Sequence, residues 1–72
     1  MMRVNFKETA WTEGLTVEGL LWQLSEDNTY LFIRRGKINV IVNNEVIPPA
    51  AYGQKEIGEG DEIRIYPVLA GG

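Results

Sequence analysis

A single stretch of this chain has the periodicity of an amphipathic helix. Apolar side chains recur there at the i, i+3, i+4, i+7 spacing of one helical face, at Val17, Leu20, Leu21 and Leu24. Thr16, which comes just before them, has a side chain suited to the N-cap. A chain of 72 residues has room for one small domain. The apolar stripe of this helix must therefore pack against whatever the remaining segments form.

The segments around the helix have the period of β-strands. Residues 2–7 alternate between apolar and polar side chains, and residues 38–42 are rich in β-branched side chains. The Asn-Asn pair at residues 43–44 tolerates the positive φ angles of a tight turn, so we expect a hairpin that returns over residues 46–47. A last strand is expected over residues 62–67. One helix laid across a small mixed sheet is an α+β fold.

Three further segments have less regular patterns. Ala10 and Trp11 are assigned to a short second strand, with Gly14 in the turn before the helix. Residues 30–33 are compatible with a strand or with the end of a loop. Residues 50–54 are expected to form a turn or a single helical turn.

Trp22 lies off the apolar stripe of the predicted helix. It is about 140° around the helical wheel from Val17, at 100° per residue. We expect its ring to flank the core, because a small domain often recruits an aromatic side chain next to the stripe. The alternative is an exposed indole that serves as a handle for a partner.

The sequence contains no cysteine and no histidine. This excludes disulfides, thiolate zinc sites, cysteine nucleophiles and the usual imidazole base. The remaining candidates for acid–base chemistry, the pairs Glu59/Asp61 and Glu8/Glu13, lie in polar, turn-like sequence and are interpreted as solvated turn residues. We therefore expect a protein that is not itself an enzyme and that binds no metal or cofactor of its own.

Acidic side chains outnumber basic ones by 10 to 7, for a net charge of -3. Binding to a nucleic-acid backbone draws its affinity from a surplus of Lys and Arg, which this chain does not have. The apolar runs are far too short to span a bilayer, and the first residues do not resemble a signal peptide. We expect a soluble cytoplasmic protein whose partners are proteins, not nucleic acids or membranes.

The chain ends in a short apolar run followed by two glycines. Because glycine has no side chain, a Gly-Gly end can pass through a slot too narrow for other residues and present its carboxylate to a partner's active site. The carboxylate of Gly72 is therefore the candidate reactive group. The candidate partner-binding residues are those before it, Val68, Leu69, Ala70 and Gly71. A frayed chain end is the alternative.

Four blocks of the sequence resemble the ThiS and MoaD sulfur carriers, which are ubiquitin-like proteins of the β-grasp fold. The blocks occur in the family's order, cover nearly the whole chain and end in Gly-Gly; they are residues 16–21, 42–48, 59–63 and 67–72. The resemblance implies one β-grasp domain over residues 1–72, with a flexible tail over residues 68–72. Residues 8–14 and 30–37 depart from the family pattern.

The resemblance also implies an activity for the chain end. In such carriers an E1-like adenylyltransferase of the ThiF or MoeB type uses ATP and magnesium to adenylate the terminal carboxylate, which here belongs to Gly72. Sulfur from a persulfide or sulfide then displaces AMP and leaves a thiocarboxylate, which donates the sulfur to an acceptor enzyme. The carrier itself binds neither ATP nor magnesium.

Two branches of the family differ in the acceptor. Residues 43–48 are similar to the thiamine branch, in which thiazole synthase receives the sulfur. Residues 66–68 lean toward the molybdopterin branch, in which the carrier is the small subunit of molybdopterin synthase and the large subunit is the acceptor. We favour a carrier of the ThiS type that serves thiamine (thiazole) biosynthesis.

Two other functions are compatible with the residues: a ubiquitin-like modifier that forms isopeptide bonds to lysines, and an inert β-grasp binding module. For a carrier, we expect the partner to dock on the exposed face of the sheet near Ile65. The basic residues Arg34, Arg35 and Lys37 are expected to form the rim of this surface. A plain solvated surface is the alternative.

Overall fold

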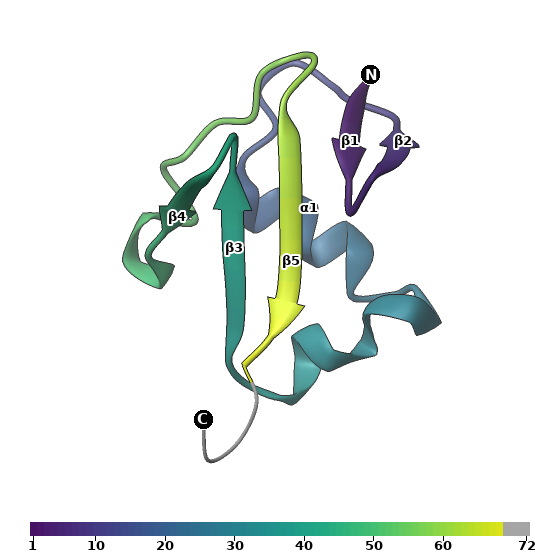
Figure 1. Cartoon of the computed structure of the whole chain (residues 1–72), viewed down its shortest axis with the longest axis vertical. Helices are drawn as coiled ribbons and strands as arrows, with labels where there is room; N and C mark the ends of the chain where they lie inside the picture. Colours follow the sequence, from purple (N-terminus) through teal and green to yellow (C-terminus); the bar gives the residue numbers. More distant parts are fainter. Residues whose placement is uncertain (69–72) are drawn as a thin grey trace.

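The computed structural model describes residues 1–68, so the expectations for Leu69, Ala70, Gly71 and Gly72 lie outside the described residues. Within residues 1–68 the chain forms five strands, one α-helix and two 3-10 helices (Figure 1). In chain order these are β1 (Met2–Val4), β2 (Lys7–Thr9), α1 (Val17–Leu24), η1 (Asn28–Arg35), β3 (Ile38–Val42), β4 (Glu45–Ile47), η2 (Pro49–Ala51) and β5 (Glu62–Pro67).

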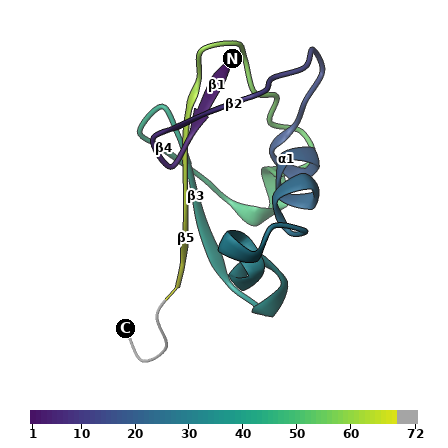
Figure 2. The same ribbon diagram turned by 90° about the vertical axis from the view of Figure 1, so that its right-hand side faces the viewer.

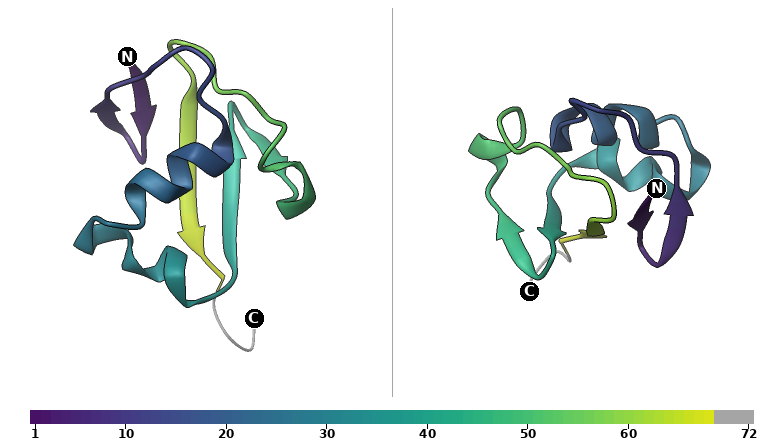
Figure 3. Two further views of the ribbon diagram at one scale, coloured as in Figure 1. Left: turned by 180° about the vertical axis from the view of Figure 1, so that it is seen from behind. Right: turned by 90° about the horizontal axis from the view of Figure 1, so that it is seen from above.

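The strands form one sheet in the order β2-β1-β5-β3-β4. The last strand in the sequence, β5, is therefore the central strand of the sheet. It pairs in parallel with β1 and antiparallel with β3, which makes the sheet mixed. The helices α1 and η1 lie on one side of the sheet, as the side view in Figure 2 and the rear view in Figure 3 show. The predicted α+β architecture is confirmed.

The core lies between the sheet and α1. Strand alternation turns one side chain in two toward the helix, and the helix contributes the stripe that its sequence predicts. Leu24, at the end of the stripe, is half-buried. The buried apolar side chains of the core are Met2, Val4, Leu15, Val17, Leu20, Leu21, Tyr30, Val40, Val42, Ile47, Ile57, Ile63 and Ile65.

The helix α1 begins where the sequence predicts. The hydroxyl of Thr16 accepts a hydrogen bond from the backbone N–H of Gly19 at 3.1 Å, which satisfies one of the free donors of the first turn. Thr16 also pairs with Glu56 in an isolated β-bridge. The start of the helix is thus tied to the segment that leads into β5.

Two tight hairpins flank the central strand, and each turns on residues with positive φ. Asn43 (φ 50°) and Asn44 (φ 70°) join β3 to β4, as the sequence predicts. Asn5 (φ 48°) and Phe6 (φ 71°) join β1 to β2. The expectation that the first strand continues to Phe6 is wrong, because the chain already reverses at Asn5.

The second strand is correspondingly earlier than predicted. It consists of Lys7–Thr9, and neither Ala10 nor Trp11 belongs to it. Trp11 lies in the connection to α1, where its half-buried ring packs against the core and its Nε1–H donates to the carbonyl of Ile57 at 2.7 Å. The segment resembles a strand in composition because it contains Trp11. This aromatic side chain is needed for packing against the core and for a part-buried hydrogen bond, not for strand pairing.

Residues 30–33 form neither a strand nor a loop end but belong to the 3-10 segment η1. Asp27 caps this segment by accepting a hydrogen bond from the N–H of Thr29 at 2.8 Å. Within it, Tyr30 is buried and its ring lies 6.0 Å from that of Phe32, centroid to centroid. The predicted helical turn after residue 49 is confirmed as η2. Between residues 1 and 68, no helix has the length and apolar character needed to cross a membrane.

Candidate functional site

The central strand carries the chain toward its C-terminus. β5 pairs with β3 over its whole length, from Val42 opposite Ile63 to Ile38 opposite Pro67. One residue further, the N–H of Val68 donates to the carbonyl of Lys37 at 3.1 Å. The chain therefore leaves the sheet where β3 begins, at the end opposite the N-terminus (Figure 1). We call this point the tail exit, defined by Lys37, Pro67 and Val68.

The residues at the tail exit are open to solvent. Val68 is 45% exposed and Tyr66 is 40% exposed. Among the five predicted site residues, Val68 is the one that the structure describes, and its accessible side chain is compatible with the predicted contact to a partner. The remaining four, Leu69, Ala70, Gly71 and Gly72, lie beyond the described residues.

The exposed face of the sheet is lined by residues that alternate with the core. Ile65 is only 1% exposed and faces the helix, so Ile65 itself does not lie on the exposed sheet face where docking is expected. The neighbouring residues Arg64 and Tyr66 point to the other face. There the guanidinium of Arg64 lies 4.9 Å from the ring centroid of Phe6, which is 63% exposed. Sequence alternation alone could have placed Arg64 on this face, whereas the contact with Phe6 depends on the unpredicted turn.

The basic residues do not form the rim of this exposed face. Arg34 and Arg35 end the segment η1, which lies on the helix side of the sheet (Figure 2). Lys37 follows them and contributes its carbonyl to the tail exit. The structure thus places the exposed Arg34 and Arg35 on the opposite side of the sheet from Arg64, and Lys37 at the tail exit itself.

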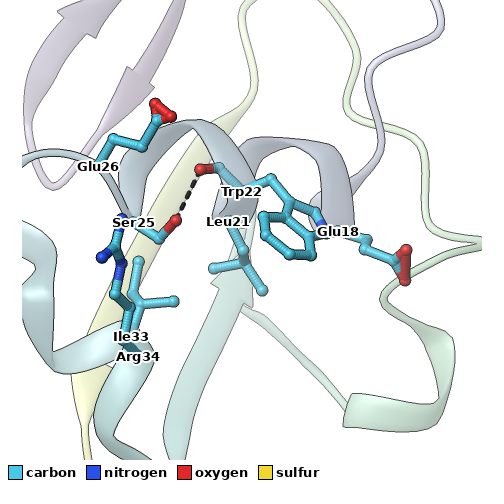
Figure 4. Close-up of a pocket in the computed structure, with 7 residues that line it drawn as sticks. All are labelled: Glu18, Leu21, Trp22, Ser25, Glu26, Ile33 and Arg34. Atoms are coloured by element: carbon cyan, nitrogen blue, oxygen red, sulfur yellow. Dashed lines mark hydrogen bonds between the residues drawn. The ribbon is translucent and has the colours of Figure 1, made fainter.

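A groove of about 740 Å³ lies between α1 and η1 (Figure 4). Trp22 stands at its edge and is 74% exposed, so the expectation that it flanks the core is wrong. Its place on α1, about 140° around the helical wheel from the buried Val17, turns the indole of Trp22 away from the core and into solvent. The groove is lined by Glu18, Leu21, Trp22, Ser25, Glu26, Ile33 and Arg34.

The acidic residues considered for chemistry have structural roles. The carboxylate of Asp61 accepts hydrogen bonds from the N–H of Gly58 at 2.7 Å and from Nδ2 of Asn43 at 3.0 Å. Glu59 pairs with the amino terminus at 3.3 Å. Glu8 and Glu13 are exposed. In the part of the chain that the structure describes, no three or more such side chains gather in a geometry that could hold a metal ion.

One titratable group has a shifted pKa. The hydroxyl of Tyr52 is buried and has no hydrogen-bond partner among residues 1–68. Desolvation disfavours the charged phenolate, so burial raises the pKa of Tyr52 above its usual value of about 10. Tyr52 lies beside the start of α1, where its carbonyl accepts from the N–H of Glu18. It belongs to the packing of the domain and is far along the chain from the tail exit.

A five-stranded mixed sheet with a helix across one face, and with its last strand at the centre, defines the ubiquitin-like β-grasp class. Residues 3–72 match the ThiS family. The chain therefore belongs to the ThiS family, the ThiS type of ubiquitin-like sulfur carrier.

A solved structure and a curated relative accompany this assignment. The crystal structure of a thiamine biosynthesis protein (ThiS) from Geobacter metallireducens is similar with a TM-score of 0.72 at 24% identity, over 99% of this chain and 97% of that one. This likeness confirms the fold. A thiazole synthase from Paramagnetospirillum magneticum is 29% identical over 69 residues, which are 96% of this chain but 19% of that protein. The chain thus spans about a fifth of the length of that relative.

Proposed function

We propose that this chain carries sulfur for thiazole formation in thiamine biosynthesis as a thiocarboxylate on Gly72. The observation that carries the proposal is that the match to the ThiS family runs to residue 72 and so includes the Gly-Gly end. The molybdopterin branch has less support, because the matching family is that of ThiS.

The chemistry needs two steps at the terminal carbonyl carbon. A carboxylate oxygen is a poor leaving group, so an E1-like partner first joins it to the α-phosphate of ATP, with magnesium, and releases pyrophosphate. Sulfide, or the outer sulfur of a persulfide, then attacks the carbonyl carbon and AMP leaves. With sulfide the product is the thiocarboxylate itself; with a persulfide it is an acyl disulfide, and a second thiol of the partner cleaves its S–S bond to give the thiocarboxylate and a disulfide. The chain has no histidine or cysteine, which fits a reaction whose catalytic groups belong to the partner.

The position of β5 supports this use of the chain end. β5 lies at the centre of the sheet, and its side chains Ile63 and Ile65 are buried in the core. β5, the strand that precedes the reactive group, is therefore anchored in the sheet and the core, while Val68 at the tail exit is accessible. A fixed strand followed by an accessible end suits delivery of a terminal carboxylate into another protein's active site.

The sulfur acceptor that we propose is a thiazole synthase. The support is a protein named thiazole synthase in which a segment similar to almost the whole of this chain accounts for 19% of the length. A carrier-like segment and an enzyme in one polypeptide are expected when the two act on the same intermediate.

The docking surface that we propose for these partners is the exposed sheet face around Arg64, Phe6 and Tyr66. This face adjoins the tail exit, since Tyr66 comes two residues before Val68. It combines two exposed aromatic rings with one guanidinium, a composition enriched in protein interfaces. We expect Arg64→Glu to weaken binding of the adenylating partner, measured by titration calorimetry, and an unchanged affinity would mean that this face is only solvated.

The proposal is tested by intact-mass analysis. The protein is incubated with its E1-like enzyme, ATP, magnesium and sulfide, and we expect the mass change of one oxygen replaced by one sulfur at the last residue. The matched control lacks Gly72 and should show no change. Conjugates to lysines without a free thiocarboxylate would instead identify a modifier. Pyrophosphate release that persists without Gly72 would contradict the proposed site.

A further inference from the structure

Among residues 1–68, the half of β5 next to the tail exit has a neighbouring strand on one side only. On the other side β1 ends at Val4, opposite Ile63. The N–H of Asn43 donates to the carbonyl of Glu62 at 2.8 Å, and that of Val68 to Lys37 at 3.1 Å. Since backbone polar groups alternate along a strand, the even-numbered residues of β5 bond toward β3, and the odd-numbered ones point toward the side where β1 has ended.

The side chain of Asn5 occupies this gap. Its Oδ1 accepts from the N–H of Ile65 at 2.8 Å, and its Nδ2 donates to the carbonyl of Ile65 at 3.0 Å. The backbone N–H of Asn5 donates to the carbonyl of Ile63 at 2.9 Å. The carboxamide therefore acts as one more peptide group of the β1 ladder. After it, Pro67 has no N–H and leaves no donor unpaired on this side.

The equivalent turn residue of the other hairpin makes a similar contact at the opposite end of β5. Oδ1 of Asn43 accepts from the N–H of Glu62 at 3.0 Å, and its Nδ2 donates to the carboxylate of Asp61. Asn5 and Asn43 have nearly the same φ, 48° and 50°, which asparagine adopts more readily than most residues. The two asparagines thus bind the central strand from its two sides, Asn43 at its start and Asn5 at Ile65, three residues before Val68.

We propose that Asn5 is a positioning residue that fixes the tail-bearing half of β5, so that the chain end reaches the adenylating partner from a constant point and direction. This role rests on the proposed function. Asn5 acts through Ile65, which lies three residues before Val68. Asn43, by contrast, stabilises the start of the strand and has no part in presenting the tail.

Matched glycine variants separate positioning from stability. Asn5→Gly retains the positive φ and removes the carboxamide alone, and Asn43→Gly does the same at the other end. Asn44→Gly is the control, because the Asn44 side chain makes no hydrogen bond within residues 1–68. Should Asn5→Gly not fold, Asn5→Asp replaces it, since a carboxylate still accepts from the N–H of Ile65 but cannot donate to its carbonyl.

The first readout is amide hydrogen exchange of the isolated chain, which needs no partner. We expect the N–H of Ile65 to exchange about tenfold faster or more in Asn5→Gly than in the wild type. In Asn43→Gly we expect the exchange rate of the Ile65 N–H to change only as far as the global stability of the domain changes. Unchanged protection of the Ile65 N–H in Asn5→Gly would overturn the proposal that Asn5 fixes this half of β5.

The second readout is steady-state pyrophosphate release with the E1-like enzyme, at a temperature where all variants are folded. We expect Asn5→Gly to raise KM about tenfold with kcat changed by less than about twofold, and Asn43→Gly to leave both unchanged. An equal rise of KM in both variants would mean that lost stability causes the rise, and it would overturn the positioning role of Asn5. If the wild type released no pyrophosphate, the proposed function would be overturned. The exchange data would still decide whether Asn5 fixes the half of β5 next to the tail exit.

Discussion

At the scale of single residues, Tyr52 couples packing to pH. Its hydroxyl is buried without a hydrogen-bond partner among residues 1–68, and burial raises its pKa. Below the unfolded-state pKa of about 10, both states keep the proton and folding has its full stability. Above that pH the unfolded state loses its proton first, so the stability contributed by Tyr52 declines until the pH exceeds the raised native pKa.

Tyr52→Phe should therefore flatten the alkaline loss of stability. Above about pH 10, until the raised native pKa of Tyr52 is passed, the free energy of unfolding of the variant should fall less steeply than that of the wild type. At neutral pH the variant should be as stable or more stable by up to about 1 kcal/mol, because an unpaired buried hydroxyl is removed. Urea denaturation across pH measures both effects, with Tyr66→Phe at an exposed position as control. Parallel pH profiles of wild type and Tyr52→Phe would contradict the raised pKa.

Gly71→Arg tests the expectation that the chain end must be slender. We expect an unchanged circular dichroism spectrum and thermal midpoint. Adenylation should fall by about a hundredfold or more, because a side chain would be placed where a narrow slot accepts bare backbone. Pyrophosphate release measures the loss, and Thr12→Arg, which adds the same charge at an exposed position, is the charge-matched control. Normal turnover of Gly71→Arg would mean that the partner's channel is wide.

At the scale of elements, the helix α1 has one face in the core and the opposite face in solvent. Leu21→Ala should destabilise the domain by about 2–5 kcal/mol, because it removes buried methyl groups and leaves a cavity. Trp22→Ala, one residue away, should change stability by less than about 0.5 kcal/mol because the indole is 74% exposed. Chemical denaturation compares the two. Equal costs would mean that the indole packs against the domain.

The elements differ in how far local sequence determines them. The helix α1 and the hairpin at Asn43 and Asn44 could be predicted, because a capping threonine, a helical stripe and two turn-forming asparagines are local signals. The first hairpin could not, because Phe6 at positive φ contradicts the usual preference for glycine and its apolar side chain prolongs the strand-like alternation. The contact with the guanidinium of Arg64 comes from a distant segment and offsets part of that backbone cost.

The segment η1 shows a second limit of local reasoning. Tyr30, Leu31, Phe32 and Ile33 form a continuous apolar run, whose period does not distinguish a strand from a helix. The side chain of Asp27 caps the start of this 3-10 segment, and the buried Tyr30 lies at a kink inside it, where its backbone angles are not helical (φ -113°, ψ 23°). The expectation for Trp22 was wrong for another reason: its position on the wheel, about 140° from Val17, already lies outside the buried face of α1.

At the scale of the whole molecule, the fold places β5 at the centre of the sheet and lets it end at the solvent-exposed tail exit. The resemblance to sulfur carriers predicted the fold and the family, and both are confirmed. The exposure of Val68 could be predicted from its place near the chain end, and its contact with a partner stays a prediction. The role of Asn5 could not, because it depends on a strand 60 residues away in the sequence. The roles of Gly71 and Gly72 stay predictions.

The measurement that tests the central proposal most directly is the intact mass of the chain after incubation with its E1-like enzyme, magnesium, ATP and sulfide. We predict that one oxygen is exchanged for sulfur, that fragmentation places the sulfur on Gly72, and that a thiazole synthase then removes it. A chain that keeps its original mass while the same enzyme thiolates an established carrier would contradict the proposal.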